Sequence, residues 1–111
     1  MIYKPDNWVM IKVHHSTPYY KILAGWGENY RIPMWKISSA IVSLEEATTT
    51  LHFHTVNGSV YKCSKMFYEL RPNVWGVWKE YKDLWGDKVE ILPENTKWKS
   101  LEYYKEKEKH A

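Results

Sequence analysis

Residues 51–63 read LHFHTVNGSVYKC, and this stretch carries the clearest fold signal in the chain. Two runs rich in apolar and β-branched residues, 51–56 and 59–63, flank the dipeptide Asn57-Gly58. Asn-Gly tolerates the left-handed backbone of a tight hairpin turn, and between strand-like runs it is the strongest short-range hairpin signal. We therefore expect an antiparallel strand pair here, and we place the neighbouring segments around it.

Two more strand-like runs lie upstream, at residues 8–13 and 19–26. They are rich in β-branched and aromatic residues, and residues 14–18 (HHSTP) between them are typical of a longer hairpin loop. Residues 35–44 also alternate with the period of a strand, but neither face of that run is polar throughout. We expect one strand there, lying between the core and a pocket.

The apolar period becomes helical in the second half of the chain. Residues 64–70 fit a short helical turn, and residues 71–73 (RPN) open the clearest helix. Apolar side chains then recur at helical spacing at Val74, Trp78, Tyr81 and Trp85. Gly86 should end this helix, and Gly76 inside it costs about 1 kcal/mol relative to alanine, which indicates close packing there. Residues 87–92 predict a last short strand.

The fold class that follows is α+β. We expect a small, strongly bent antiparallel sheet or barrel of about five strands, with one helix in the C-terminal half that covers an open end. At 111 residues the chain has the size of one domain with one modest core. We place a single globular domain at residues 1–104, and we expect residues 105–111, where lysines alternate with glutamates, to be a charged flexible tail.

Composition excludes several classes of protein. The longest apolar run, residues 22–26, is too short to cross a bilayer, so we expect no membrane partner. The first residues lack the apolar stretch and the cleavage site of a signal peptide, and the single Cys63 cannot close an internal disulfide. We therefore expect a cytoplasmic protein.

The net charge of +3 comes from lysines that are mixed with acids along the chain. Proteins that bind nucleic acid usually concentrate basic charge on one face, so this distribution disfavours a nucleic-acid partner. Only the first half leans basic, which would suit a small anion. Arginine, the usual bidentate clamp for phosphate, stands only at Arg31 and Arg71.

Catalytic machinery is sparse. His52 and His54 would project from one face of a strand, and residues 14–15 could add a third imidazole for zinc, but we favour a pair of half-exposed strand histidines. Cys63 could act as a nucleophile, although an apolar strand-end cysteine is more often a small buried hydrophobe. The chain has no glycine-rich phosphate loop. We expect no enzymatic activity, catalytic residue, metal or cofactor, and slow hydrolysis by the two strand histidines is the enzymatic alternative.

Aromatic side chains make up 16% of the chain and include seven tryptophans, more ring surface than so small a domain readily hides. One explanation is a core of bulky residues, and the other is a surface that grips a planar or apolar partner. Residues 35–39 (WKISS) combine a ring, an ammonium group and hydroxyls that could stack a base and bind ribose or phosphate. We predict a ligand pocket at the mouth of the barrel with these contacts: Tyr20, Trp26, Arg31, Trp35, Lys36, Ser38, Ser39, Tyr61 and Lys62.

Several segments are similar to a known group of proteins. They are residues 1–8 (MIYKPDNW), 20–26 (YKILAGW), 35–39 (WKISS), 58–63 (GSVYKC) and 86–90 (GDKVE). Together they resemble small uncharacterised proteins of tailed phages of the marine type, over most of residues 1–98. The motifs are distinctive as a string but carry no recognised chemistry. Residues 28–34 and 45–50 depart from the pattern and leave the identity of the ligand open.

The resemblance implies a phage protein that acts inside an infected bacterial host cell. Phages carry small non-enzymatic proteins that blunt host defence, and one strategy is to trap the nucleotide messenger of a defence enzyme. By analogy we expect an anti-defence protein that sequesters a host immune nucleotide, of the cyclic mononucleotide or cyclic ADP-ribose type, without turnover. Two alternatives stay open: a protein-binding inhibitor of a host enzyme and a single-stranded nucleic-acid binder. The same rings could also hold a homo-oligomer together.

Overall fold

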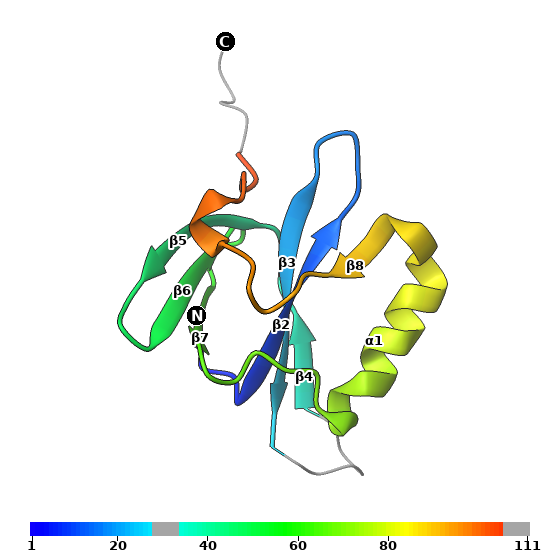
Figure 1. Ribbon diagram of the computed structural model, residues 1–111, viewed down its shortest axis with the longest axis horizontal. Helices are drawn as coiled ribbons and strands as arrows, with labels where there is room; N and C mark the ends of the chain where they lie inside the picture. The colour runs from blue at the N-terminus through cyan, green and yellow to red at the C-terminus, as the bar shows by residue number, and fades with distance from the viewer. Residues whose placement is uncertain (28–33, 106–111) are drawn as a thin grey trace.

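The computed structural model describes residues 1–27 and 34–105, and these residues form two sheets and one α-helix (Figure 1). The strands are β1 Ile2–Tyr3, β2 Asn7–Val13, β3 Tyr19–Trp26, β4 Met34–Ile37, β5 Ile41–Glu46, β6 Thr50–Thr55, β7 Val60–Ser64 and β8 Val89–Ile91. The helix α1 spans Pro72–Trp85, and the 3-10 turns η1 Gly86–Lys88 and η2 Trp98–Ser100 follow it. The first sheet has the order β1-β7-β6-β5, and the second has the order β4-β3-β2-β8.

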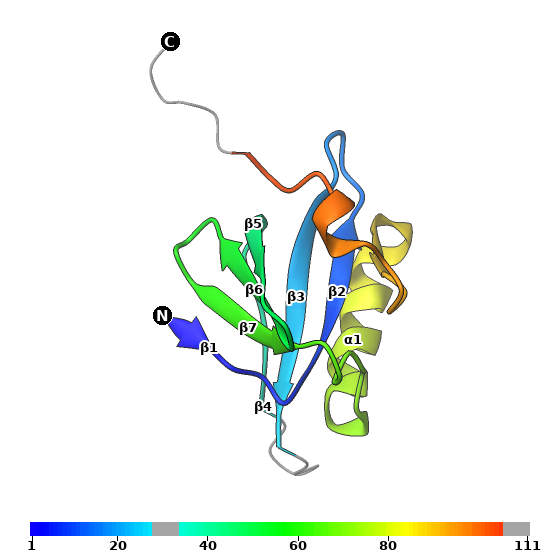
Figure 2. The same cartoon turned by 60° about the vertical axis from the view of Figure 1, so that its left-hand side comes forward.

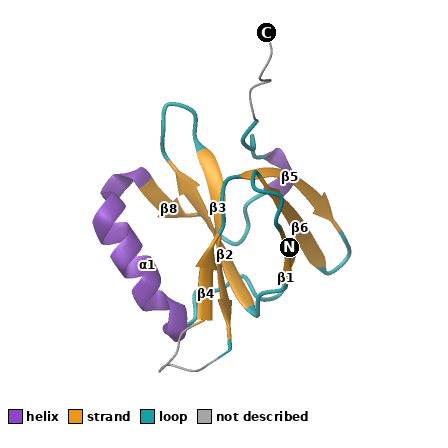
Figure 3. Ribbon diagram, turned by 180° about the vertical axis from the view of Figure 1, so that it is seen from behind, coloured by secondary structure: helices purple, strands orange, loops and turns teal. Residues whose placement is uncertain are grey.

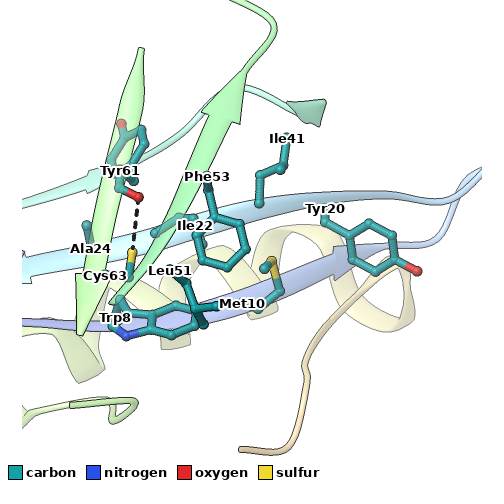
Figure 4. Close-up of a cluster of buried hydrophobic side chains, with 10 residues drawn as sticks. All are labelled: Trp8, Met10, Tyr20, Ile22, Ala24, Ile41, Leu51, Phe53, Tyr61 and Cys63. Carbon is teal, nitrogen blue, oxygen red and sulfur yellow. Dashed lines mark hydrogen bonds between the residues drawn. The ribbon is translucent and has the colours of Figure 1, made fainter. Parts of the chain in front are cut away.

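The two sheets face each other across the main core, and α1 lies on the far side of the second sheet, so the fold has three layers (Figure 2). Trp8 and Met10 of β2 point toward the first sheet, where Phe53 and Tyr61 complete the buried cluster (Figure 4). Because side chains alternate along a strand, the intervening residues of β2, such as Val9, face α1. β2 is apolar along most of its length because both of its faces are covered.

Helix α1 covers the outer face of the second sheet (Figure 3). Val74 is buried against the sheet, and Val77, Trp78 and Tyr81 are partly buried beside it. The helix ends at Gly86, whose φ is +58° and whose N–H donates to the carbonyl oxygen of Lys82. The predicted helix and its stop are therefore confirmed. The expected position over the open end of a barrel is wrong, because the helix packs along the face of a sheet.

Two glycines of the sequence differ sharply in how closely their surroundings approach them. Gly25 in β3 faces α1, and a Cβ atom placed there would lie 2.6 Å from Cγ2 of Val74 and 2.9 Å from Oδ1 of Asn7. Only glycine lets the helix come this close to the sheet. A Cβ atom at Gly76 would meet nothing within 4 Å. The close packing expected at Gly76 is therefore wrong, and it occurs at Gly25 instead.

The hairpin at Asn57-Gly58 is confirmed. β6 and β7 pair antiparallel, and Gly58 has the positive φ, +88°, that glycine adopts without strain. Oδ1 of Asn57 accepts hydrogen bonds from the hydroxyl of Thr55 at 2.7 Å and from the N–H of Ser59 at 3.2 Å, which hold the turn. The upstream hairpin is confirmed as well, because β2 and β3 pair antiparallel along nearly their whole length.

The single strand expected at residues 35–44 is wrong. β4 pairs with β3 in the second sheet, whereas β5 pairs with β6 in the first. At the break, the hydroxyl of Ser38 accepts the N–H of Ile22 at 2.8 Å and donates to the carbonyl oxygen of Ser39 at 2.7 Å. These side-chain bonds compete with strand pairing and let the chain cross between the sheets. The described residues thus form eight strands in two sheets that do not close into a barrel.

Three other segments differ from expectation. Residues 64–70 are not helical, and Tyr68 forms an isolated parallel β-bridge with Trp8 of β2. No sequence signal indicated β1, which pairs parallel with the edge of β7. The last strand is shorter than expected, because η1 takes up its first residues.

The chain that follows β8 closes one side of the sandwich. The N–H of Leu92 donates to the carbonyl oxygen of Met10 at 3.0 Å, and the N–H of Tyr104 donates to that of Ile41, also at 3.0 Å. This C-terminal segment is therefore attached to both sheets. The predicted charged tail lies, except for its first residue, outside the described residues and stays a prediction.

Candidate binding groove

A groove of about 490 Å³ opens between the first sheet and the C-terminal segment, and we call it the Trp98 groove. Its apolar wall consists of Trp8, Leu51, Tyr68 and Trp98, and its polar rim consists of Glu46, Lys65, Glu94, Thr96, Lys97, Lys99 and Ser100. Pockets that enclose small organic ligands usually have volumes of about 300–1,000 Å³. The groove therefore has room for a nucleotide.

Three rings pack against one another in the wall of the groove. Trp98 lies 5.5 Å from Trp8 and 5.3 Å from Tyr68, measured between ring centroids. The indole N–H of Trp8 donates to the carbonyl oxygen of Ser64 at 2.7 Å, and the hydroxyl of Tyr68 donates to the carbonyl oxygen of Leu92. Burial raises the pKa of Tyr68 to about 12, so this ring is neutral at physiological pH. The wall is thus a fixed, uncharged aromatic surface.

The local sequence explains how η2 presents Trp98. Thr96 folds back on Pro93, because its N–H and its hydroxyl both donate to the Pro93 carbonyl oxygen, at 3.1 and 2.6 Å. The N–H of Ser100 then donates to the carbonyl oxygen of Lys97 at 2.9 Å and closes the turn. The ring of Trp98 packs on the core, while the lysines on either side of it are exposed.

The rim of the groove carries ion contacts of Glu46 with a lysine beside the first sheet and with a lysine of η2. Oε2 of Glu46 lies 2.7 Å from Nζ of Lys65, and Oε1 lies 3.7 Å from Nζ of Lys99. The hydrogen bond from Lys65 and its charge, with a smaller effect of Lys99, lower the pKa of Glu46, so this carboxylate is ionised at neutral pH. Lys97 has no ion-pair partner among the described residues. Three lysines against two glutamates leave the rim with a positive formal charge.

Three of the predicted ligand contacts come together around Tyr3. The ring of Tyr3 stacks on Tyr61 with 4.9 Å between centroids and meets Trp26 edge-on at 6.1 Å. Nζ of Lys36 lies 5.3 Å from the centroid of the Tyr3 ring. Tyr3 therefore occupies the position beside these groups where we expected the nucleobase of a ligand.

Three more predicted contacts bond to or pack against other parts of the chain. Ser38 is buried, and its hydroxyl serves the main chain at the strand break described above. The hydroxyl of Ser39 accepts the N–H of Asn57 at 3.4 Å. Tyr20 is buried and packs edge-on against Tyr103 with 5.7 Å between centroids. The core of bulky rings thus accounts for part of the aromatic surplus.

The last predicted contacts lie on an edge strand, on the outer face of the first sheet and outside the described residues. Trp35 stands opposite Gly25 on the edge strand β4 and is 46% exposed. Lys62 stands opposite His52 in the register of β6 and β7, on the outer face of the first sheet. Arg31 lies outside the described residues. None of the predicted contacts that the structure describes lines the Trp98 groove, and contact between any of them and a ligand stays a prediction.

The histidines of β6 form the half-exposed pair that we favoured. Nε2 of His54 lies 2.7 Å from Oε1 of Glu45, and Nε2 of His52 lies 2.9 Å from the hydroxyl of Thr50. Within the described residues, no three His, Cys, Asp or Glu side chains cluster in a way that could hold a metal ion. Cys63 is buried, and burial raises the pKa of its thiol, so its role as a small buried hydrophobe is confirmed.

None of the residues that line the Trp98 groove was among the predicted ligand contacts. The triplet Lys97-Trp98-Lys99 places an ammonium group on each side of a ring, and this local signal could have indicated a binding segment. Glu46 and Tyr68 offered no such signal, because their approach to Trp98 depends on how the sheets and the C-terminal segment pack.

A comparison with protein-family models, with curated proteins and with solved structures gives no match for this chain. The resemblance to phage proteins therefore stays a prediction. Over the part of the chain that the structure describes, no helix combines the length and the apolar composition needed to cross a membrane.

Proposed function

We propose that this protein holds a small nucleotide in the Trp98 groove without changing it chemically. The observation that carries the proposal is the combination of a fixed aromatic wall and a lysine-rich rim in one groove of about 490 Å³. These are the two kinds of contact that a nucleotide requires, since its base is planar and its phosphate is anionic.

The base would stack on Trp98 and Tyr68, whose rings are half-buried and held by the core. Stacking of a base on an aromatic side chain contributes about 1–3 kcal/mol and tolerates any base. The phosphate would accept charge-assisted hydrogen bonds from Lys65, Lys97 and Lys99. The ligand would thus lie with its base on the apolar wall and its phosphate at the rim.

Retention without turnover is the biochemical role that we propose for the groove. Its described lining contains no histidine or cysteine, and one of its two glutamates is held in an ion pair. Together with the resemblance to phage proteins, this supports a protein that sequesters a nucleotide messenger of host defence in the cytoplasm of an infected bacterial cell. The messenger would be of the cyclic mononucleotide or cyclic ADP-ribose type.

Retention can be tested directly. The purified protein is incubated with cyclic mononucleotides, cyclic dinucleotides and cyclic ADP-ribose isomers, then filtered and heat-denatured, and both fractions are analysed by mass spectrometry. We expect one compound to disappear from the filtrate and to return intact after denaturation. A cleaved product would contradict retention without turnover, and full recovery of every compound in the filtrate would contradict nucleotide binding.

Two tryptophan variants locate the bound ligand. Trp98→Ala should abolish retention, whereas Trp75→Ala should leave it intact, because Trp75 is exposed on α1 and does not line the groove. Both variants are first compared with the wild-type chain by circular dichroism. Equal retention by a folded Trp98→Ala variant would place the ligand elsewhere.

A protein partner is the second candidate, and exposed apolar side chains on α1 favour it. Trp75, Leu84 and Trp85 are all exposed, and large apolar side chains of this kind are frequent anchors in protein interfaces. Self-association through this helix is the simplest form of the idea. Sedimentation of the wild-type chain and of Leu84→Glu tests it, because a dimer built on this helix should dissociate in the variant.

A further inference from the structure

The carboxylate of Glu46, at the end of β5, lies between two lysines that come from opposite sides of the Trp98 groove. Its Oε2 is 2.7 Å from Nζ of Lys65, which directly follows β7, and its Oε1 is 3.7 Å from Nζ of Lys99 in η2. Each carboxylate oxygen thus faces a different lysine, one beside the first sheet and one in the C-terminal segment. A phosphate group also presents several anionic oxygens, so it would meet the same two ammonium groups.

The arrangement around Glu46 is open to solvent. The side chains of Glu46, Lys65 and Lys99 are 37%, 32% and 68% exposed, and ion pairs at such positions contribute little to folding. Replacing the carboxylate by another anion therefore costs the fold little. A displaced Glu46 would still stand near the groove and repel incoming negative charge.

A ligand's charge decides whether this exchange is favourable. A nucleotide with a single negative charge does no more than replace the charge that Glu46 already supplies to Lys65 and Lys99. A nucleotide with two negative charges can satisfy this lysine pair and also reach Lys97, which has no ion-pair partner among the described residues.

We propose, on the basis of the proposed function, that Glu46 is a specificity-determining residue that selects nucleotides with two phosphate groups. The first phosphate takes the place of the Glu46 carboxylate between Lys65 and Lys99, and the second phosphate binds Lys97. The preferred class of ligand is then a pyrophosphate-containing nucleotide, such as a cyclic ADP-ribose, and a cyclic mononucleotide binds more weakly.

Isothermal titration calorimetry of the full chain tests this assignment with three probes that share one base: adenosine, cyclic AMP and cyclic ADP-ribose. The wild-type chain should bind cyclic ADP-ribose about tenfold more tightly than cyclic AMP. Glu46→Gln keeps the size of the side chain and removes its charge, so it should tighten cyclic AMP binding about fivefold and leave adenosine binding unchanged. Glu94→Gln is the matched control, because Glu94 also lines the rim but forms no ion pair in the described structure.

The outcomes separate this inference from the proposed function. If the probes bind and Glu46→Gln behaves as Glu94→Gln does, Glu46 does not select the ligand, while nucleotide binding stands. Equal tightening of adenosine and cyclic AMP would also overturn the inference, since adenosine carries no phosphate. If a folded wild-type chain binds none of the probes and nothing in the wider panel, nucleotide binding itself is disproved, and the inference with it.

Discussion

The ring of Trp98 packs against the ring of Trp8, with 5.5 Å between their centroids and 54° between their planes. Trp8 is buried between the two sheets, whereas Trp98 is half-buried and faces the groove. The wall of the candidate site is therefore continuous with the core. Changes at Trp98 should affect both folding and binding, so the two effects have to be measured separately.

The contribution of Trp98 to folding can be compared with that of an exposed tryptophan. We expect Trp98→Ala to lower the free energy of unfolding by about 2 kcal/mol, less than for a fully buried tryptophan, because Trp98 loses its contacts with Trp8 and Tyr68. Trp75→Ala should change it by less than about 0.5 kcal/mol. Urea unfolding measures both values. Equal losses in the two variants would show that Trp98 does not belong to the core.

The two glycines Gly25 and Gly76 should respond to alanine with opposite signs. Gly25→Ala brings a methyl group to within 2.6 Å of Cγ2 of Val74, which forces the helix away from the sheet and should cost about 2 kcal/mol. Gly76→Ala meets open space inside a helix and should stabilise the protein by about 1 kcal/mol. Thermal unfolding of the two variants checks the signs. Stabilisation by Gly25→Ala would refute the close contact between β3 and α1.

Alkaline pH should destabilise the fold through buried tyrosines. Burial raises the pKa of Tyr61 and of Tyr68 to about 12, whereas a tyrosine of the unfolded chain has a pKa of about 10. The unfolded state therefore releases these protons first, and the free energy of unfolding falls as pH rises from about 10 toward 12. Urea unfolding at a series of pH values measures the fall. Tyr61→Phe should make it less steep, and an unchanged slope would mean that other groups cause it.

Tyr3 should anchor the unpredicted strand β1. Tyr3→Ala removes the ring that stacks on Tyr61 and should lower the free energy of unfolding by about 1–2 kcal/mol. Ile2→Ala, at an exposed neighbouring position, should change it by less than about 0.5 kcal/mol. Chemical unfolding of both variants compares them. If Tyr3→Ala is as stable as Ile2→Ala, the stacked pair contributes nothing.

Local patterns predicted the elements whose geometry depends on neighbouring residues. The β6–β7 turn needed a residue with positive φ, and Gly58 provides it. α1 needed an apolar stripe and a stop, which its periodicity and Gly86 supply. The same reasoning failed at Ser38, where alternation continues through a strand break. Ile22, whose N–H binds that hydroxyl, is distant in the sequence, so no local window contains the cause.

The aromatic side chains also show which features the sequence predicted and which depended on the tertiary structure. The number of rings indicated that some would lie outside a small core, and five of those that the structure describes are in fact exposed: Trp35, Phe67, Trp75, Trp85 and Tyr104. Which rings are buried was not visible in the sequence. Tyr20 and Tyr61, predicted as ligand contacts, lie in the core because strand alternation and sheet packing turn them inward.

The sequence by itself determined the α+β class, the two main hairpins, the helix and its end, because each depends on residues that are neighbours along the chain. Only the tertiary structure decided that the strands form two sheets and that the candidate site lies at the Trp98 groove. The groove joins Trp8, Glu46 and Lys65 to a C-terminal turn. These groups come together only when the sheets and the C-terminal segment pack, because the contacts between them join residues that are far apart in the sequence.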